Sequence, residues 1–252
     1  MAPSFDIIIP ARFASKRLPG KPLRDICGKP LIQRVYECAC NSSADSVTVA
    51  TDDPGIFRVA ESFGANVCMT SGKHSSGTDR VAEAAIILKL DDQRIVVNLQ
   101  GDEPRMPGSL IDQVAETLAA DPTASLATAC QPLEHQEEYE DPDIVKVVRD
   151  KKNFALYFSR APIPSSRSIA KIEGDGTHWS IIRRHIGLYA YRVNYLKDFL
   201  RQDSAPLELT EKLEQLRALW NGDSFLVCNA VQAPGPGVDT LADLEEAILY
   251  FS

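Results

Sequence analysis

The sequence has no long apolar run and no leader-like start. None of its 252 residues belongs to a stretch approaching the roughly 18 consecutive apolar residues of a membrane-spanning helix. Residues 1–6 contain no basic stretch before an apolar one, which is the order typical of a secretory signal. We therefore expect a cytoplasmic protein with no membrane insertion.

The sequence also lacks the cysteine and histidine spacings of zinc and redox sites. Its six cysteines include no Cys-x-x-Cys pair, and none has a histidine partner at the spacing of a zinc finger. We interpret them as buried thiols. They are Cys27, Cys38, Cys40, Cys68, Cys130 and Cys228.

An excess of positive charge, which nucleic-acid surfaces require, is missing as well. The formal net charge is −8, although residues 1–34 carry seven Lys and Arg residues against two acids, a local charge of +5. A short basic segment in an acidic chain can bind a small polyanion such as a nucleoside triphosphate. We expect no nucleic-acid partner.

Composition and length are those of one large globular domain. The hydrophobic fraction of 44% and the charged fraction of 25% exclude disordered, collagen-like and coiled-coil chains. The length is about 1.7 times the usual domain size. We expect a single domain over residues 1–252.

Strand and helix patterns alternate along the first half of the chain. Apolar runs predict strands at 5–9, 46–51, 66–69, 95–99 and 125–130. Apolar residues at helical spacing predict helices at 30–40, from Asp53-Pro54, from a Thr78 cap to about Leu90, and at 108–120. Such alternation is typical of a parallel sheet with right-handed crossovers.

The pattern changes in the second half. From roughly 143 to 192 the signal is strand-like, which we interpret as an antiparallel excursion. Helices at 193–201 and 206–220, a strand at 224–231 and a helix opened by the capping box Thr240-x-x-Asp243 follow. The predicted fold is α/β, a doubly wound and mostly parallel sheet with a smaller β-rich excursion.

Polar residues follow three predicted strands, at the edge where open α/β sheets bind ligands. These segments are 10–22, 51–53 and 100–104. The first has neither the Walker pattern nor Gly-x-Gly-x-x-Gly, which argues against an oxidoreductase. Its charged and small residues suit a triphosphate. They are Arg12, Ser15, Lys16, Arg17, Gly20 and Lys21.

Two aspartates stand at the ends of predicted elements. Asp102 follows an apolar strand and Asp239 precedes a capped helix, so the two could share one Mg²⁺ ion. Magnesium usually takes one or two carboxylates together with phosphate oxygens and water. Each aspartate taken alone is more often a turn or cap residue than a metal ligand.

The loop sequence Pro10-Ala-Arg-x-x-Ser-x-Arg-Leu-Pro-Gly-Lys-Pro-Leu resembles the signature of the 3-deoxy-manno-octulosonate cytidylyltransferase family. Further segments match that family in order, so that the resemblance spans roughly residues 7 to 250. They are 50–52, 74–80, 99–104, 157–160, 185–189, 212–217 and 237–240. The resemblance implies a nucleotidyltransferase-like fold and a homodimer formed through the β-rich part.

The resemblance also implies a reaction and its residues. The anomeric hydroxyl of an eight-carbon ulosonic acid would attack the α-phosphorus of CTP and release pyrophosphate, giving a CMP-sugar for lipopolysaccharide biosynthesis. Arg12, Lys21 and Asp102 would be catalytic, without a His or Cys nucleophile. The nucleotide would contact Arg12, Ser15, Lys21, Thr51, Ser76, Gly77, Thr78 and Arg80. Asp102 and Asp239 would bind Mg²⁺, and the sugar would contact Gln100, Arg160, His185, Tyr189, Glu214 and Gln215.

Three departures from the family pattern leave alternatives open. Asp79 stands where the family usually has Glu, Leu241 where it has Pro, and Ser165–Ser168 replaces a stretch with an aromatic and an acid. The last departure allows the 8-amino analogue of the sugar as an alternative substrate. A non-catalytic nucleotide-sugar sensor is a further alternative, against which Lys21, Asp102 and Asp239 argue.

Overall fold

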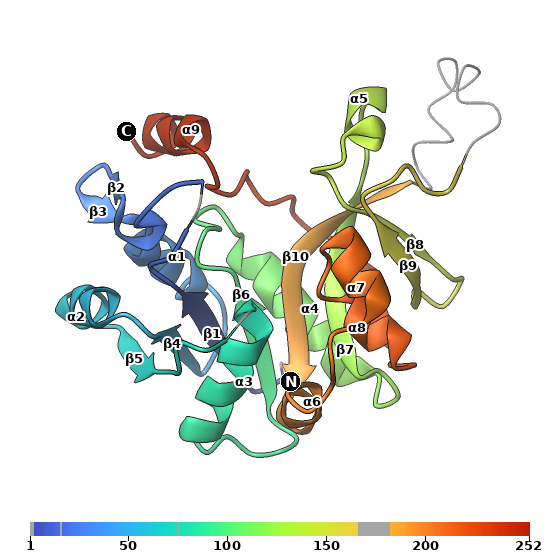
Figure 1. Ribbon diagram of the computed structural model, residues 1–252, viewed down its shortest axis with the longest axis horizontal. Coiled ribbons are helices and arrows are strands. Elements are labelled where there is room, and N and C mark those ends of the chain that lie inside the picture. Colours follow the sequence, from blue (N-terminus) through green and yellow to red (C-terminus); the bar gives the residue numbers. More distant parts are fainter. Residues whose placement is uncertain (1–2, 16, 75, 166–181) are drawn as a thin grey trace.

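A computed structural model describes residues 3–15, 17–74, 76–165 and 182–252. Helices cover both faces of a central sheet (Figure 1). The sheet contains β1 (Phe5–Ala11), β4 (Ser46–Thr51), β5 (Asn66–Met69), β6 (Ile95–Leu99), β7 (Leu126–Pro132), β8 (Lys146–Arg149), β9 (Ala155–Ser159), β10 (Arg183–Arg192) and β11 (Phe225–Asn229). The strands β2 (Asp25–Ile26) and β3 (Lys29–Pro30) form a separate small antiparallel sheet.

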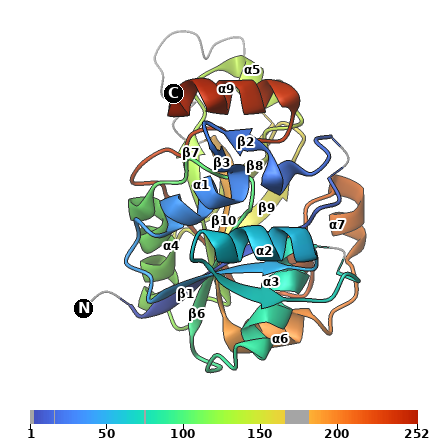
Figure 2. The ribbon, with the colours of Figure 1, turned by 90° about the vertical axis from the view of Figure 1, so that its left-hand side faces the viewer.

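The helices follow the predicted alternation. They are α1 (Leu31–Ala39), α2 (Pro54–Ser62), α3 (Gly77–Ile87), α4 (Gly108–Ala120), α5 (Gln136–Glu140), α6 (Val193–Phe199), α7 (Pro206–Glu211), α8 (Leu216–Trp220) and α9 (Leu241–Phe251). A 3₁₀ helix, η1, spans Lys21–Leu23. Figure 2 shows α9 beside β2 and β3, which it contacts. Within the described ranges no helix is both long and apolar enough to cross a membrane.

The strand order is β11-β7-β10-β6-β1-β4-β5. Strand β1 pairs in parallel with β4 on one side and with β6 on the other, and the pairs β4–β5 and β7–β11 are also parallel. Strand β10 runs antiparallel to both β6 and β7. The predicted doubly wound, mostly parallel sheet is therefore confirmed.

The segment predicted as an antiparallel excursion has two parts in the structure. Strands β8 and β9 form a hairpin that projects from the sheet (Figure 1). Strand β10 instead lies inside the central sheet, where Tyr189 stands opposite Asn98 of β6. The last strand of this segment, β10, is therefore part of the main sheet, and it extends to the edge at which β6 ends.

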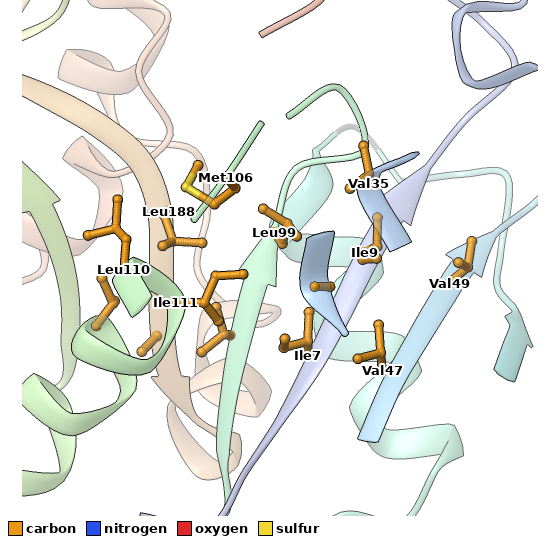
Figure 3. Packing of buried hydrophobic residues seen from close by; sticks show 14 of the residues in the cluster. Ile7, Ile9, Val35, Val47, Val49, Leu99, Met106, Leu110, Ile111 and Leu188 are labelled. Atoms are coloured by element: carbon orange, nitrogen blue, oxygen red, sulfur yellow. The ribbon is translucent and has the colours of Figure 1, made fainter. Parts of the chain in front are cut away.

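The core has two layers because successive side chains of a strand point to opposite faces. Ile7 and Ile9 of β1 pack with α1, α2, α4 and α9, whereas Ile8 packs with α3, α6 and α8. Figure 3 shows the first layer, in which Ile7 and Ile9 lie on the same face of the sheet as Leu110 and Ile111 of α4. This alternation explains the continuous apolar run in β1, since both of its faces are covered.

Two local predictions about helices are wrong. The cap of α3 is Ser76, whose hydroxyl accepts a hydrogen bond from the amide of Asp79, and Thr78 lies within the first turn. The helix predicted over 206–220 is two helices, because Lys212 adopts a left-handed conformation with φ of 56°. The break leaves Leu209 and Trp220 more than half exposed, although helical spacing groups them with the buried Leu213 and Leu216.

The cysteine prediction is correct only in part. Cys68 and Cys130 are buried, Cys38 and Cys228 are half-buried, and Cys27 and Cys40 are exposed. The two exposed thiols lie beyond the ends of apolar elements, in the turn between β2 and β3 and after α1. Position in a turn, which composition does not reveal, decides their exposure.

Candidate active site

The carboxyl ends of β1, β4 and β6 meet at one edge of the sheet. The chain leaves β1 toward β4 on one side and later returns to β6 on the other, and ligands bind at such switch points. A cleft of about 700 Å³ opens there. Its lining includes Pro10, Arg12, Ser15, Arg17, Lys21, His74, Ser76, Gly77, Arg80, Gln100, Gly101, Asp102 and Asp239.

The loop after β1 brings its basic residues to the cleft through a tight turn. Leu18 is buried and anchors the middle of the loop. Gly20 adopts φ of 66°, a left-handed conformation that favours glycine, and it precedes η1, in which Pro22 helps to fix the helical backbone. The turn directs Lys21 into the cleft beside Arg12 and Ser15, as the sequence predicted.

Lys21 and the two aspartates meet in the cleft. The Nζ atom of Lys21 lies 2.5 Å from Oδ2 of Asp102 and 2.9 Å from Oδ1 of Asp239. A guanidinium nitrogen of Arg17 lies 2.9 Å from the other oxygen of Asp239. Burial lowers the pKa of Lys21. The charge and hydrogen bond of Asp102, together with those of Asp239, raise it by more than burial lowers it, so the pKa is raised overall. The ammonium is therefore fully protonated at neutral pH.

Backbone contacts hold the segment after β6 against β1. A Cβ atom on Gly101 would lie 2.7 Å from the carbonyl oxygen of Pro10, so only glycine fits at this approach. The neighbouring Glu103 is half-buried, and burial together with the charges of Asp102 and Asp239 raises its pKa to about 8. The Glu103 carboxyl group is thus not fully exposed to solvent.

The aspartate pair fits a magnesium ion. Both carboxylates already converge on one cation, the Lys21 ammonium, although Asp102 follows β6 and Asp239 precedes α9. Mg²⁺ requires one or two protein carboxylates when phosphate oxygens and water complete its shell. In the described ranges no group of three or more His, Cys, Asp and Glu side chains is arranged to hold a metal. The donor set here is therefore suited to an ion that arrives with phosphate ligands.

The residues expected around cytidine separate into two groups. Ser76, Gly77 and Arg80 line the cleft. Arg80 is buried and pairs with Asp52, at 3.0 Å, and with the hydroxyl of Thr70. Thr51 is fully buried and does not line the cleft; its hydroxyl accepts a hydrogen bond from the amide of Asp53, the cap of α2. Its visible role is to shape the end of β4.

A second cavity of about 200 Å³ adjoins the cleft, and Gln100 lines both. Its wall includes Thr78, Gln100, Tyr189, Tyr191, Glu214 and Gln215. Thr78 therefore lies on this side rather than with the nucleotide group. The amide nitrogen of Gln100 donates to Asn98, and Asn98 donates to the hydroxyl of Thr78, so a chain of polar groups connects the two cavities.

Glu214 joins the second cavity to the start of α3. Its Oε1 atom accepts a hydrogen bond of 3.0 Å from the Ser76 hydroxyl, which also caps α3. Burial raises the pKa of Glu214 to about 7, and the charge of Asp79 adds to this rise. The carboxyl group therefore titrates close to neutral pH, where it can accept or donate a hydrogen bond.

Two residues expected at the sugar line neither cavity. His185 is buried against the rings of Phe158 and Tyr189, and burial lowers its pKa to about 3. Its Nε2 atom lies 3.0 Å from the hydroxyl of Thr128, so the ring is neutral and supports Tyr189 from behind. Arg160 donates to the backbone carbonyls of Glu211 and Pro142. His185 therefore borders the second cavity through Tyr189, whereas Arg160 contacts the end of α7.

Sequence reasoning gave no individual role to two residues of the cleft, Arg17 in the basic loop and His74 in the segment 74–80. Arg17 pairs with Asp239, and His74 lies 2.6 Å from the carboxylate of Glu83. Both stand in segments that the sequence marked as polar loops, but charge alone does not tell which loop residue turns inward. Of the Ser165–Ser168 departure only Ser165 is among the described residues. Lys16 and Ser75 also lie outside them.

Asp79, the first departure from the family pattern, is not among the residues that line the cleft. Its carboxylate lies 3.9 Å from the guanidinium of Arg217, and both side chains are largely buried between α3 and α8. The change from Glu to Asp therefore affects the contact between these helices. Leu241 begins α9 after the Thr240 cap and is largely exposed, so proline is not needed there to open the helix.

Comparison with known proteins identifies relatives along nearly the whole chain. The family described as Cytidylyltransferase matches residues 7–225. The 3-deoxy-manno-octulosonate cytidylyltransferase of Hahella chejuensis is 52% identical over 243 residues, which cover 96% of this chain and 95% of the relative. That of Thioalkalivibrio sulfidiphilus is 53% identical, with 96% of each chain covered.

Solved structures agree with the sequence relatives. The structure of CMP:2-keto-3-deoxy-manno-octonic acid synthetase complexed with CTP superposes with a TM-score of 0.88 at 40% identity, and 98% of each chain is covered. A cytidylyltransferase from Leptospira borgpetersenii superposes with a TM-score of 0.59 at 17% identity, covering 96% of this chain and 84% of the other, and so shares the fold.

Proposed function

The chain belongs to the cytidylyltransferase family, and from this premise we propose that it joins the CMP of CTP to 3-deoxy-manno-octulosonate. The anomeric oxygen of the sugar forms a bond to the α-phosphorus, the bond from that phosphorus to the bridging oxygen breaks, and pyrophosphate leaves. The hydroxyl proton is released. The position of Gln100 supports this pairing of substrates, because Gln100 lines both a cationic cleft and a smaller polar cavity.

The triphosphate would lie against the loop after β1. Arg12, Ser15 and Lys21 supply a guanidinium, a hydroxyl and an ammonium group within the cleft. These groups neutralise phosphate charge and form charge-assisted hydrogen bonds, which are stronger than neutral ones. In the proposed assignment Arg12 and Lys21 are catalytic because they act on charge that moves to the leaving pyrophosphate.

Asp102 and Asp239 would hold a Mg²⁺ ion that binds with the triphosphate. When bound, the ion supplies Lewis-acid stabilisation of negative charge on phosphate oxygens. The two carboxylates face the Lys21 ammonium, which would contact the triphosphate in the proposed assignment. We assign Asp102 a catalytic role because it lies shortly after the end of β6, at the same edge of the sheet as Gln100.

The cytidine would occupy the side of the cleft formed by the start of α3. Ser76 and Gly77 leave the backbone open to a close approach by the base, and Arg80 is fixed by its pair with Asp52. Thr51 and Thr78, the remaining members of the proposed nucleotide set, support this wall from within the protein.

The sugar acid would occupy the second cavity. Gln100, Tyr189, Glu214 and Gln215 present amide, phenol and carboxyl groups that can bind sugar hydroxyls. His185 and Arg160 complete the proposed sugar set from the border: His185 packs behind Tyr189, and Arg160 retains a guanidinium that is 35% exposed for a substrate carboxylate.

Catalysis would rest on positioning and charge neutralisation. Bringing the sugar hydroxyl in line with the leaving pyrophosphate converts an encounter of two substrates into a reaction within one complex. The residues that line the two described cavities include no cysteine, and His74 is occupied by Glu83. We therefore expect direct displacement without a covalent enzyme intermediate.

The biological setting is also part of the proposal. We propose a cytoplasmic homodimer that supplies an activated sugar for lipopolysaccharide biosynthesis, with the β-rich part as the dimer contact. Light scattering of the purified protein measures its mass against the 27.7 kDa chain. A monomeric mass under assay conditions would contradict the dimer.

Pyrophosphate release with CTP and a panel of ulosonic acids tests the function. We expect release with 3-deoxy-manno-octulosonate and CTP, much less with the other nucleoside triphosphates, and release slower by roughly 10³ with Asp102→Asn. A higher kcat/KM for the 8-amino sugar would reassign the substrate. Tight CTP binding without pyrophosphate release under any condition would refute catalysis and favour a nucleotide-sugar sensor.

A further inference from the structure

Arg217 is a buried cation that lines neither cavity. Its side chain is 5% exposed. It stands on α8 directly after the segment that carries Glu214 and Gln215. Its Nε and Nη2 atoms donate to the two carboxylate oxygens of Glu208 on α7, at 2.9 and 2.6 Å. This two-point pairing fixes the plane of the guanidinium as well as its position.

The other faces of the guanidinium contact two further helices. One nitrogen lies 3.9 Å from Asp79 on α3, and the central carbon lies 4.3 Å from the ring centre of Phe199 on α6. One side chain thus contacts α3, α6 and α7 from α8. Helices α7 and α8 lie next to each other (Figure 1), and α8 also contacts β9.

The segment that Arg217 anchors is not stable by itself. Helix α7 has six residues and α8 has five, and Lys212 between them is in the left-handed conformation. Helices this short are unstable in water without tertiary contacts. The orientation of Glu214 and Gln215, which lie between the two helices, therefore depends on the contacts that hold α7 and α8 against α3.

Glu214 and Arg217 contact the same turn of α3. Glu214 accepts a hydrogen bond from Ser76, the cap of α3, while Arg217 faces Asp79 three residues later. The Ser76 hydroxyl also accepts from the amide of Asp79. A shift of Arg217 would therefore move Glu214 relative to the helix start that lines the nucleotide cleft.

We propose that Arg217 is a positioning residue for the sugar acid, which holds Glu214 and Gln215 against the first turn of α3. The inference rests on the proposed function, because that function assigns the sugar acid to the cavity that Glu214 and Gln215 line. Arg217 acts through these residues and does not touch the substrate.

The charge of Arg217 also favours the ionised form of Glu214. Burial and then Asp79 raise the pKa of Glu214, while the hydroxyls of Thr78 and Ser76 and the charge of Arg217 oppose the rise. The other titratable groups near it are tyrosines that are neutral at pH 7: Tyr189 and Tyr191 of β10 and Tyr195 of α6. Loss of Arg217 should therefore move the titration of Glu214 toward higher pH.

Steady-state kinetics of Arg217→Met test the proposal. We expect the KM for the sugar acid to rise by about 10- to 100-fold, the effect of misplacing a binding group, while the KM for CTP changes by less than about threefold. The acidic limb of the kcat/KM profile for the sugar should move to higher pH. Arg217→Lys, which keeps the charge but not the two-point pairing, should restore the pH profile and part of the KM.

Two further variants separate positioning from folding. Arg217→Met leaves the buried Glu208 carboxylate without its partner, so Arg217→Met/Glu208→Gln removes that charge and should recover thermal stability but not the sugar KM. Arg201→Met deletes an exposed arginine that pairs with Asp198 and should change neither KM.

The outcomes distinguish the two claims. A folded Arg217→Met protein with an unchanged sugar KM and pH profile, or with equal rises in both KM values, would overturn the role of Arg217 alone. A wild-type protein that releases no pyrophosphate with any ulosonic acid would overturn the proposed function, and the sugar role of Arg217 with it.

Discussion

Replacing Lys21 by methionine should abolish most of the activity while leaving two carboxylates facing each other. Methionine keeps the length and apolar stem of the side chain and removes only the ammonium, which lies 2.5 and 2.9 Å from Asp102 and Asp239. In the proposed reaction this charge acts on the phosphates. Losing one charge-assisted contact that strengthens in the transition state costs about 3–4 kcal/mol, so kcat/KM should fall by roughly 10² to 10³.

The pH dependence of the stability of Lys21→Met provides an independent test. Lys21 has a raised pKa in the folded protein, so its stabilising contribution is fully present below its unfolded pKa of 10.5 and is lost as pH rises through the folded value. The wild type should therefore be more stable than Lys21→Met at neutral pH, where the contribution of the Lys21 ammonium is fully present. This difference should shrink in more alkaline buffers.

The assay is pyrophosphate release at saturating and subsaturating CTP, with urea unfolding of both proteins at several pH values. Lys29→Met is the matched control, because Lys29 also pairs with a carboxylate, Glu37 at 2.7 Å, but in an exposed position away from the cleft. A folded Lys21→Met enzyme with kcat/KM within about fivefold of the wild type would refute the charge argument.

Three other predictions follow from described contacts. Asp102→Asn and Asp239→Asn should each lower kcat by roughly 10³. If the two aspartates act as a unit, the double variant should lose little more activity than either single variant. A normal Mg²⁺ dependence in Asp239→Asn would contradict a shared ion. Glu214 has a folded pKa of about 7, above its ordinary value, so the wild type should lose stability as pH rises from 4.5 to 7. Glu214→Gln should remove this loss in pH-dependent thermal melts, and an identical slope would exclude Glu214 as its source. Lys146 donates to three backbone carbonyls, so Lys146→Met should destabilise the protein by about 2–4 kcal/mol in urea, whereas the exposed Lys152→Met should not.

The sheet and its ligand edge were predictable because they follow from local patterns. Apolar runs mark β1, β4 and β6, and each is followed by polar residues. Parallel pairing then requires that these strand ends meet. Gly20 and the prolines around it mark the turn that directs Lys21 inward, so this part of the cleft could be predicted without knowledge of distant contacts.

The arrangement of charges inside the cleft could not be predicted in this way. Lys21 is separated from Asp102 by 81 positions and from Asp239 by 218. Sequence reasoning assigned the lysine to phosphate and the aspartates to metal, but only the fold shows that all three groups occupy one place. Pairwise geometry of this kind depends on tertiary packing, which no local pattern encodes.

The break at Lys212 has a similar cause. Leu209, Leu213, Leu216 and Trp220 have the spacing of one amphipathic helix, and nothing local ends it. Glu208 and Arg217 pair across α7 and α8, and residues nine positions apart can meet in this way only if the helix is interrupted. The interruption places Glu214 and Gln215 at the second cavity, so the missed boundary is also the feature that builds the proposed sugar site.

The position of β10 determines how that site meets the nucleotide edge. If the strand-like segment had remained outside the sheet, Tyr189 would lie far from the end of β6. Because β10 enters between β6 and β7, Tyr189 stands opposite Asn98, two residues before Gln100. Gln100 in turn donates to Asn98 and lines both cavities. An antiparallel strand inside a parallel sheet therefore brings the wall of the proposed sugar site next to the edge at which the proposed triphosphate-binding groups lie.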